Sequence, residues 1–241
     1  MKKSLFLLFV LISVQQVMAQ GILSQTGGKI YIGGSIGPSF PIGDFGETVP
    51  DQEKSGYATT GYKVEVDAGV RLFNLLEVSA VGFRNINETN PDNLKNYLVE
   101  QYPSADFNVE SDDWEIYGFL GGIGLSYPLP NKFIADIRIL GGYMNITSPN
   151  ISLTTANPGV YYKVESSTTS SFVYLTSASL RYPVLKRLYI SLGFDYIGSS
   201  ADFKDVTTIR SFEGNTVESK ASFEQTMDSW ALTVGFKFFI L

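Results

Sequence analysis

The stretch GYKVEVDAGVRL, residues 61–72, decides the fold of this chain. Every second residue in it is apolar, and the residues between them include four charged ones, Lys63, Glu65, Asp67 and Arg71. Strict alternation is the period of a β-strand, because successive side chains point to opposite faces of the strand. The stretch therefore predicts a strand with one apolar face and one charged face, and the fold depends on which face meets water.

The same alternation predicts seven more strands, at residues 29–40, 75–83, 115–127, 133–143, 172–182, 188–196 and 230–240. The connecting segments between the strands, which we call joints, alternate in length. Joints 73–74, 128–132 and 183–187 are short, and joints 41–60, 84–114, 144–171 and 197–229 are long. An up-and-down sheet places alternate joints at opposite ends. Transmembrane barrels have short periplasmic turns and long extracellular loops.

Two closed sheets fit this pattern, and they place the apolar face differently. In a soluble lipocalin-like barrel the apolar face lines a cavity, whereas in an outer-membrane barrel it meets lipid and the polar face fills the interior. The polar face of strand 230–240 consists of Ala231, Thr233, Gly235 and Lys237. Such mostly small residues suit a narrow lumen and favour the membrane barrel.

Aromatic residues on the apolar face gather at the strand ends and favour the same choice. Tyr117 to Tyr127 and Phe133 to Tyr143 each span ten residue steps, which at ~3.3 Å per step and a tilt near 40° is roughly 20–25 Å of height. Aromatic belts at both edges of an apolar band are typical of membrane barrels. We therefore expect an all-β fold, an eight-stranded antiparallel up-and-down transmembrane β-barrel with short periplasmic turns and long extracellular loops.

The N-terminus indicates export. Lys2 and Lys3 precede an apolar run that ends at Gln15, and Val17-Met18-Ala19 offers a cleavage site. These features predict a signal peptide at residues 1–19, followed by one barrel domain at residues 20–241. Loss of the two lysines takes the formal charge from −6 to −8. That charge argues against a nucleic-acid partner.

The composition argues against an enzyme. The 241 residues include no histidine and no cysteine, so the commonest general base, the commonest metal ligand and any disulfide are missing. The glycine pairs do not precede a Gly-Lys-Ser/Thr sequence and do not indicate a phosphate site. We expect no catalytic residue, no cofactor and no metal site.

Charged residues on the predicted inward faces form the main group of candidate site residues. Five are positive and five are negative, so mutual pairing is possible, and buried charge is costly unless it is paired. We expect an ion-pair plug across the lumen, with a small polar conduit as the alternative. The ten residues are Lys63, Glu65, Asp67, Arg71, Glu77, Asp136, Arg138, Arg181, Asp195 and Lys237.

Two of the long joints carry further hypotheses. Joint 84–114 is acidic, which favours either a solvated loop or a surface for divalent cations or a partner. In joint 144–171, ISLTT at 151–155 and VYYKV at 160–164 predict a hairpin above the membrane. Its exposed edge would accept a partner strand, and Tyr161 and Tyr162 would supply contact area.

The chain resembles a known family. The signal peptide, the stretch GGSIGPSFPIGDF at 33–45 and the aromatic final strand resemble the small eight-stranded outer-membrane β-barrel domain common in Bacteroidota. That domain is often labelled porin-family, and OmpX and the membrane domain of OmpA are architectural relatives. The resemblance implies a place in the outer membrane of a Gram-negative envelope. It also implies recognition of the final strand by the barrel assembly machinery, although Ile240 and Leu241 here follow the aromatic pair Phe238 and Phe239.

These observations lead to one functional interpretation with two alternatives. We expect a non-enzymatic outer-membrane barrel with a plugged lumen that acts through surface loops or envelope partners, in adhesion, binding or envelope integrity. The first alternative is a narrow porin-like transporter of small polar or amphipathic solutes. The second is an accessory barrel in assembly or secretion.

Overall fold

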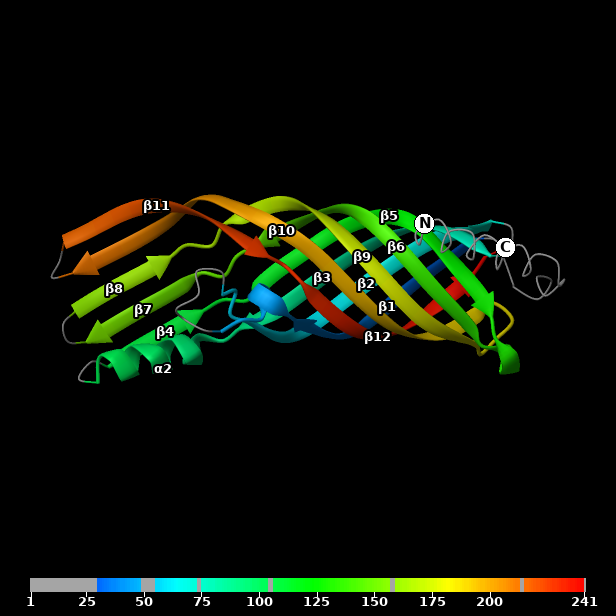
Figure 1. Ribbon diagram of the computed structural model, residues 1–241, viewed down its shortest axis with the longest axis horizontal. Coiled ribbons are helices and arrows are strands. Elements are labelled where there is room, and N and C mark those ends of the chain that lie inside the picture. The colour runs from blue at the N-terminus through cyan, green and yellow to red at the C-terminus, as the bar shows by residue number, and fades with distance from the viewer. Residues whose placement is uncertain are drawn as a thin grey trace, which may run out of the picture.

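A computed structural model describes residues 30–48, 55–72, 75–103, 106–156, 159–212 and 215–240 (Figure 1). The predicted signal peptide, residues 1–19, lies outside the described residues. Within them the chain forms one 12-stranded sheet whose paired strands are all antiparallel, with the single α-helix α2 (Pro91–Gln101) and two short 3-10 helices, η2 (Gly43–Phe45) and η3 (Pro130–Lys132).

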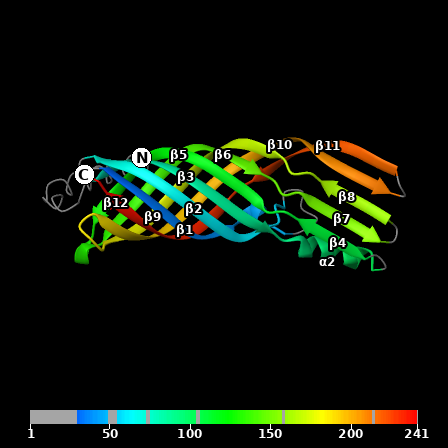
Figure 2. The same ribbon diagram turned by 180° about the vertical axis from the view of Figure 1, so that it is seen from behind.

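Eight of the strands close into a ring, which occupies the right side of Figure 1 and is seen from behind in Figure 2. Each strand pairs with two neighbours, and β12 closes the ring because it pairs with both β1 and β10. In ring order the strands are β1 (Ile30–Pro41), β2 (Ala58–Leu72), β3 (Leu76–Thr89), β5 (Trp114–Pro128), β6 (Ile134–Thr147), β9 (Thr168–Pro183), β10 (Leu188–Phe212) and β12 (Ser229–Phe239).

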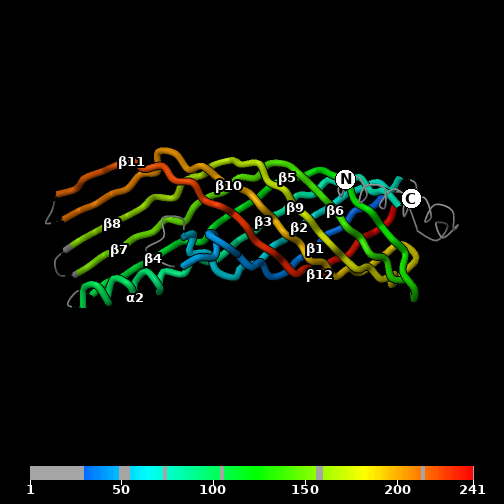
Figure 3. Tube along the Cα trace, in the orientation of Figure 1, coloured from blue at the N-terminus to red at the C-terminus, as the bar shows by residue number. Residues whose placement is uncertain are grey.

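Beyond the ring, the long joints build a second piece of sheet, which we call the extension sheet. It consists of β11 (Asn215–Thr226), the outer half of β10, β8 (Gly159–Val164), β7 (Ile151–Ala156) and β4 (Phe107–Ser111), paired in that order. Helix α2 packs beside β4. The tube in Figure 3 shows β10 running without a break from the ring into the extension.

Each of the eight predicted strand segments forms a strand of the ring. The prediction was wrong about where three of them end. β3 runs on to Thr89 and β6 to Thr147, and β10 continues to Phe212 instead of ending at residue 196. Joint 84–114, expected as an acidic loop, contains the end of β3, helix α2 and strand β4.

The alternation of the opening stretch sorts its side chains between the inside and the outside of the ring. Lys63, Glu65 and Arg71 are buried, whereas Val66 on the other face is 63% exposed. The same holds around the ring, where the outer face exposes large apolar side chains on all eight strands. Examples are Ile36, Val66, Val78, Phe119, Ile139, Tyr174, Leu192 and Val234.

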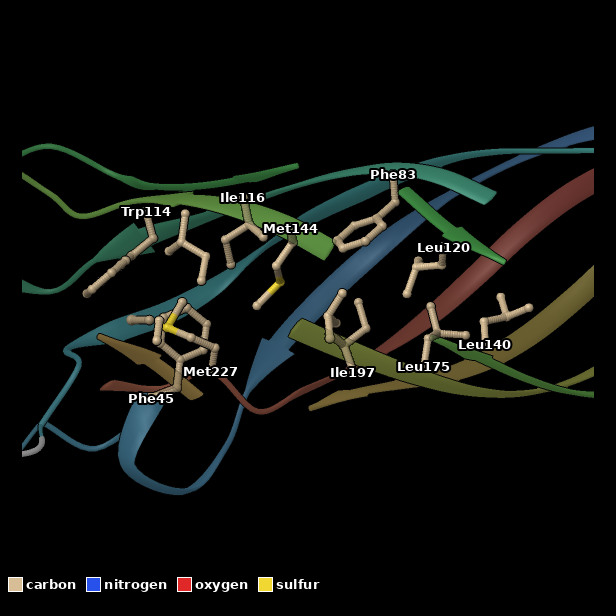
Figure 4. Close-up of a cluster of buried hydrophobic side chains, with 14 of the residues drawn as sticks. Phe45, Phe83, Trp114, Ile116, Leu120, Leu140, Met144, Leu175, Ile197 and Met227 are labelled. Atoms are coloured by element: carbon tan, nitrogen blue, oxygen red, sulfur yellow. The ribbon is translucent and has the colours of Figure 1, made fainter. Parts of the chain in front are cut away.

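The interior differs from the expectation in one respect. Near the long joints it is filled by large apolar side chains, not by small polar ones (Figure 4). Leu120, Met144 and Leu175 extend inward from ring strands, and Phe45 and Met227 close the cluster from the joints. The interior is therefore mixed. A smaller cluster of Tyr31, Ile134, Tyr189 and Phe239 lies near the short turns, and the hydrogen-bonded Ser39, Asn85 and Asn87 lie near the long joints.

Candidate functional site

The ten charged residues singled out in the sequence all lie inside the ring. Each is at most 8% exposed, and nine of the ten take part in ion pairs. They extend along the interior from the short turns, where Arg71 and Glu77 lie opposite each other on β2 and β3, to Asp195, which pairs with Ala231 toward the long joints. We call these ten residues the charge network.

Several ion pairs of the charge network join strands that are not neighbours in the ring. Arg138 on β6 reaches β2, where its Nη2 lies 3.0 Å from Glu65 and its Nη1 lies 3.3 Å from Asp67. Lys63 on β2 lies 2.7 Å from Asp195 on β10 and 2.8 Å from Glu65. Because these contacts cross the interior, they tie opposite walls of the ring together.

A second group of contacts lies closer to the short turns. Lys237 lies 3.3 Å from Glu77 and 3.5 Å from Asp67, and the hydroxyl of Tyr31 donates to Glu77. Tyr31 lies across Gly69, where a Cβ atom would stand 2.6 Å from the Tyr31 ring. A glycine at this position thus lets the tyrosine reach Glu77.

Arg181 and Asp136 form a further pair on the neighbouring strands β9 and β6. The Arg181 guanidinium donates to Asp136 over 2.5 Å, and Ser126 donates to the same carboxylate over 2.6 Å. Both charged side chains are almost fully buried. Only Nη2 of Arg181 makes hydrogen bonds, to Asp136 and Ser126, whereas its Nη1 has no hydrogen-bond partner among the described residues.

Arg71 is the exception in the charge network. No described carboxylate forms an ion pair with it, and its Nε and Nη2 have no hydrogen-bond partner among the described residues. Its guanidinium instead lies over the ring of Phe239, 4.8 Å from the centroid. The five carboxylates of the network are held by the other four cations, so the equal count of charges in the sequence does not mean that all ten pair.

The charge network leaves little free space. A cavity among Glu65, Asp67, Arg138, Asp195 and Lys237 has a volume of about 20 Å³, which is room for about one water molecule. Lys63 also lies 6.0 Å from the ring of Phe83, which belongs to the apolar cluster. The charged and apolar parts of the interior therefore meet side by side.

The predicted hairpin is present as β7 and β8, which pair with each other. The hypothesis that it offers an open edge is wrong, because β7 also pairs with β4 and β8 also pairs with β10. Tyr161 and Tyr162 lie on opposite faces of the extension sheet. Tyr162 pairs in register with Arg210, whose guanidinium lies 5.3 Å from its ring.

The two faces of the extension sheet differ in polarity. The face of Tyr162 also carries Leu153 and Val109, which are paired in register with it across β7 and β4. The face of Tyr161 carries Lys163 and Glu110. The extension sheet is therefore amphipathic.

The described residues form neither a metal-binding cluster nor a helical membrane span. Within them, no group of three or more Asp and Glu side chains has the arrangement needed to hold a metal ion. No helix formed by those residues has the length and apolar character to cross a membrane.

The open outer strand β11 was missed from the sequence. Its residues 215–222 are exposed on both faces, so they show no apolar alternation. The Gly214-Asn215 dipeptide at its start is a turn signal that could have indicated a second hairpin.

Comparisons with known proteins give structural likeness only. No protein-family model matches the chain, and no curated protein sequence matches it. Among solved structures, Neisserial surface protein A (NspA) is 12% identical with a TM-score of 0.47, over 88% of this chain and 99% of that one. Ail, the attachment invasion locus protein of Yersinia pestis, is 11% identical with a TM-score of 0.42, over 88% of this chain and 100% of that one.

The outer membrane protein OprG from Pseudomonas aeruginosa is 10% identical with a TM-score of 0.45, over 90% of this chain and 99% of that one. At such low identities, and with TM-scores below 0.5, these similarities assign neither a family nor a function to this chain.

Proposed function

We propose that the protein is an outer-membrane β-barrel that is closed to solutes and works by presenting the extension sheet to a macromolecular partner. In this proposal the ring spans the membrane, the short turns lie in the periplasm and the extension sheet stands outside the cell. The barrel assembly machinery would insert it after the signal peptide is removed.

The apolar outer face of the ring supports the membrane part of the proposal. Soluble proteins rarely expose apolar patches of more than a few hundred Å², whereas here the outer face of every ring strand exposes large apolar side chains. Aromatic contacts lie near both ends of this face. Phe40 stacks on Trp230 at 4.1 Å at one end, and Phe133 meets Tyr182 at 5.1 Å at the other.

One observation carries the functional part: the interior is filled, and described residues of three long joints form a sheet beyond the ring. Cross-ring ion pairs such as Lys63–Asp195 and the apolar cluster around Leu120 occupy the interior. Among the described residues, joints 84–114, 144–171 and 197–229 form a paired five-stranded sheet with a helix, which is more structure than closing the ring requires. Ordered loops on a rigid scaffold are the usual place for binding.

The proposed topology can be tested with two epitope insertions in otherwise identical cells. An epitope between Phe212 and Asn215, at the tip of the extension sheet, is expected to bind antibody on intact cells. An epitope in the short turn at residues 184–187 is expected to bind antibody only after the outer membrane is permeabilised. Equal labelling of both sites on intact cells, or recovery of the protein in the soluble fraction, would contradict the proposal.

A further inference from the structure

β11 forms an open edge of the extension sheet. Among the described strands it pairs only with β10, and residues 215–222 are exposed on both faces. An open edge presents unpaired N–H and C=O groups that accept another strand. The opposite outer strand, β4, has helix α2 packed beside it, so β11 is the accessible edge.

Two opposite charges stand on this edge. Glu218 lies opposite Ile209 and Lys220 lies opposite Thr207 of β10. The two charged side chains point to the same face, because they are two residues apart. Both are exposed, and neither forms an ion pair with a described residue.

We propose that β11 pairs with β11 of a second copy of this protein, antiparallel and centred on Ser219. In this register Glu218 of each copy lies opposite Lys220 of the other, so two opposite-charge pairs form across the contact. On the other face Val217, which is 63% exposed, is covered by Ala221 of the second copy. The paired residues 216–222 all lie in the exposed stretch.

Neighbouring registers are less favourable. Moving the centre of the pairing to Glu218 sets the two copies of that residue against each other, and moving it to Lys220 does the same for the lysines, so like charges meet. A register that pairs Lys220 with Glu224 would bring Gln225, which is buried, into the contact. Glu224 also accepts a hydrogen bond from Ser200 in its own copy.

The antiparallel direction fixes how the two molecules stand. β11 runs along the long axis of the molecule (Figure 1), so antiparallel pairing turns the second copy end for end and places the two rings at opposite ends. A symmetric parallel pairing is excluded. Its twofold axis would run along the strands, so the same residue of the two copies would point to opposite faces of the joined sheet. This inference rests on the proposed function, which places each ring in a membrane. The contact therefore joins two facing membranes.

The contact is small, because only seven residues of each strand pair. One such pair binds weakly, but a vesicle or a cell carries many copies. Once a few contacts form between two surfaces, further contacts form at high effective concentration. Tethering of membranes is therefore the sensitive measurement.

The experiment uses full-length protein reconstituted into two populations of phosphatidylcholine vesicles that carry different dyes. The wild type is expected to tether the two populations. Glu218→Lys on both populations sets lysine against lysine across the contact and should abolish tethering, and Lys220→Glu on both sets glutamate against glutamate and should do the same. Glu218→Lys on one population and Lys220→Glu on the other restores both opposite-charge pairs and should restore tethering.

Two controls change the net charge equally at the far edge of the extension sheet. Lys95→Glu on α2 and Glu110→Lys on β4 are expected to tether as the wild type does. The inference is overturned if inserted wild-type protein does not tether vesicles, or if the two single variants still tether. Failure of the mixed vesicles to recover tethering also overturns it.

Insertion is measured separately, so that the inference and the proposed function can fail independently. Protein that does not float with the vesicles contradicts the membrane barrel itself. Protein that floats with the vesicles and resists unfolding until heated, but does not tether them, overturns only the β11 contact.

Discussion

At the scale of single residues, the charge network predicts that its cations contribute very different amounts to the free energy of unfolding. Arg138 bonds Glu65, Asp67 and Ser177, so Arg138→Met would leave two buried carboxylates without one of their partners. We expect a loss of about 3–5 kcal/mol in the free energy of unfolding, because two buried ion pairs are broken and only Lys63 and Lys237 remain to hold the two carboxylates. The measurement is reversible urea unfolding in detergent micelles.

Arg71→Met is the matched control for this prediction. Arg71 is equally buried but has no ion pair among the described residues, and Glu77 keeps Tyr31 and Lys237 as partners when Arg71 is removed. We expect a change of about 1 kcal/mol or less, because Arg71 has no ion pair that its removal would break. Equal losses of unfolding free energy in the two variants would show that ion pairing across the ring does not determine how much each cation stabilises the fold.

The residues also show what the sequence could and could not predict. The inward direction of Glu65, Asp67 and Arg138 follows from alternation alone, because the period of a strand is two. Which charge meets which does not follow from alternation. Arg138 reaches Glu65 only because the strands close into a ring with a particular register, and that register is not readable from any one strand.

At the scale of elements, the outer half of β10 shows why a strand can be missed. Its buried residues are Ala201 and Phe203, and then Val206 and Thr208, so the alternation slips by one residue between Phe203 and Val206. The pairing with β11 shifts at the same place, and Asp205 has a φ of 54°. A β-bulge inserts an unpaired residue, so the alternation breaks although the strand continues.

The hairpin β7–β8 carries a prediction about how the two sheets depend on each other. Thr147 and Thr168 lie opposite each other on β6 and β9, so replacing residues 148–167 with Asn-Gly closes these strands with a two-residue turn. The ring should still fold, because its own pairings are kept. The extension sheet should loosen, because the deletion removes β7 and β8, which join β10 to β4.

Two measurements separate these outcomes. The wild type and the shortened protein are both expected to show a heat-dependent shift in gel mobility. Limited proteolysis is expected to cut the shortened protein, but not the wild type, within residues 199–226. Loss of the mobility shift would mean that the ring depends on the hairpin, and unchanged protease resistance would mean that β10 and β11 hold together alone.

At the scale of the whole molecule, the contents of the ring decide between a surface-binding protein and a transporter. Eight strands leave an interior just wide enough for side chains to fill, and here both parts of it are filled. The charge network leaves a cavity of about 20 Å³. Near the long joints Trp114, Leu120 and Met144 pack into one apolar cluster. A solute would have to break ion pairs such as Lys63–Asp195 to pass.

We therefore expect the wild-type protein to show no steady single-channel current in planar bilayers. Insertion is verified by the heat-dependent mobility shift, and a sixteen-stranded porin in the same bilayer serves as the conducting control, because such porins hold an aqueous channel. The Arg138→Met variant should conduct no better than the wild type if the apolar cluster closes the ring on its own. Stable currents from the wild type would contradict the closed interior and favour the transport of small polar or amphipathic solutes. A current that appears only in Arg138→Met would place the barrier in the charge network and not in the apolar cluster.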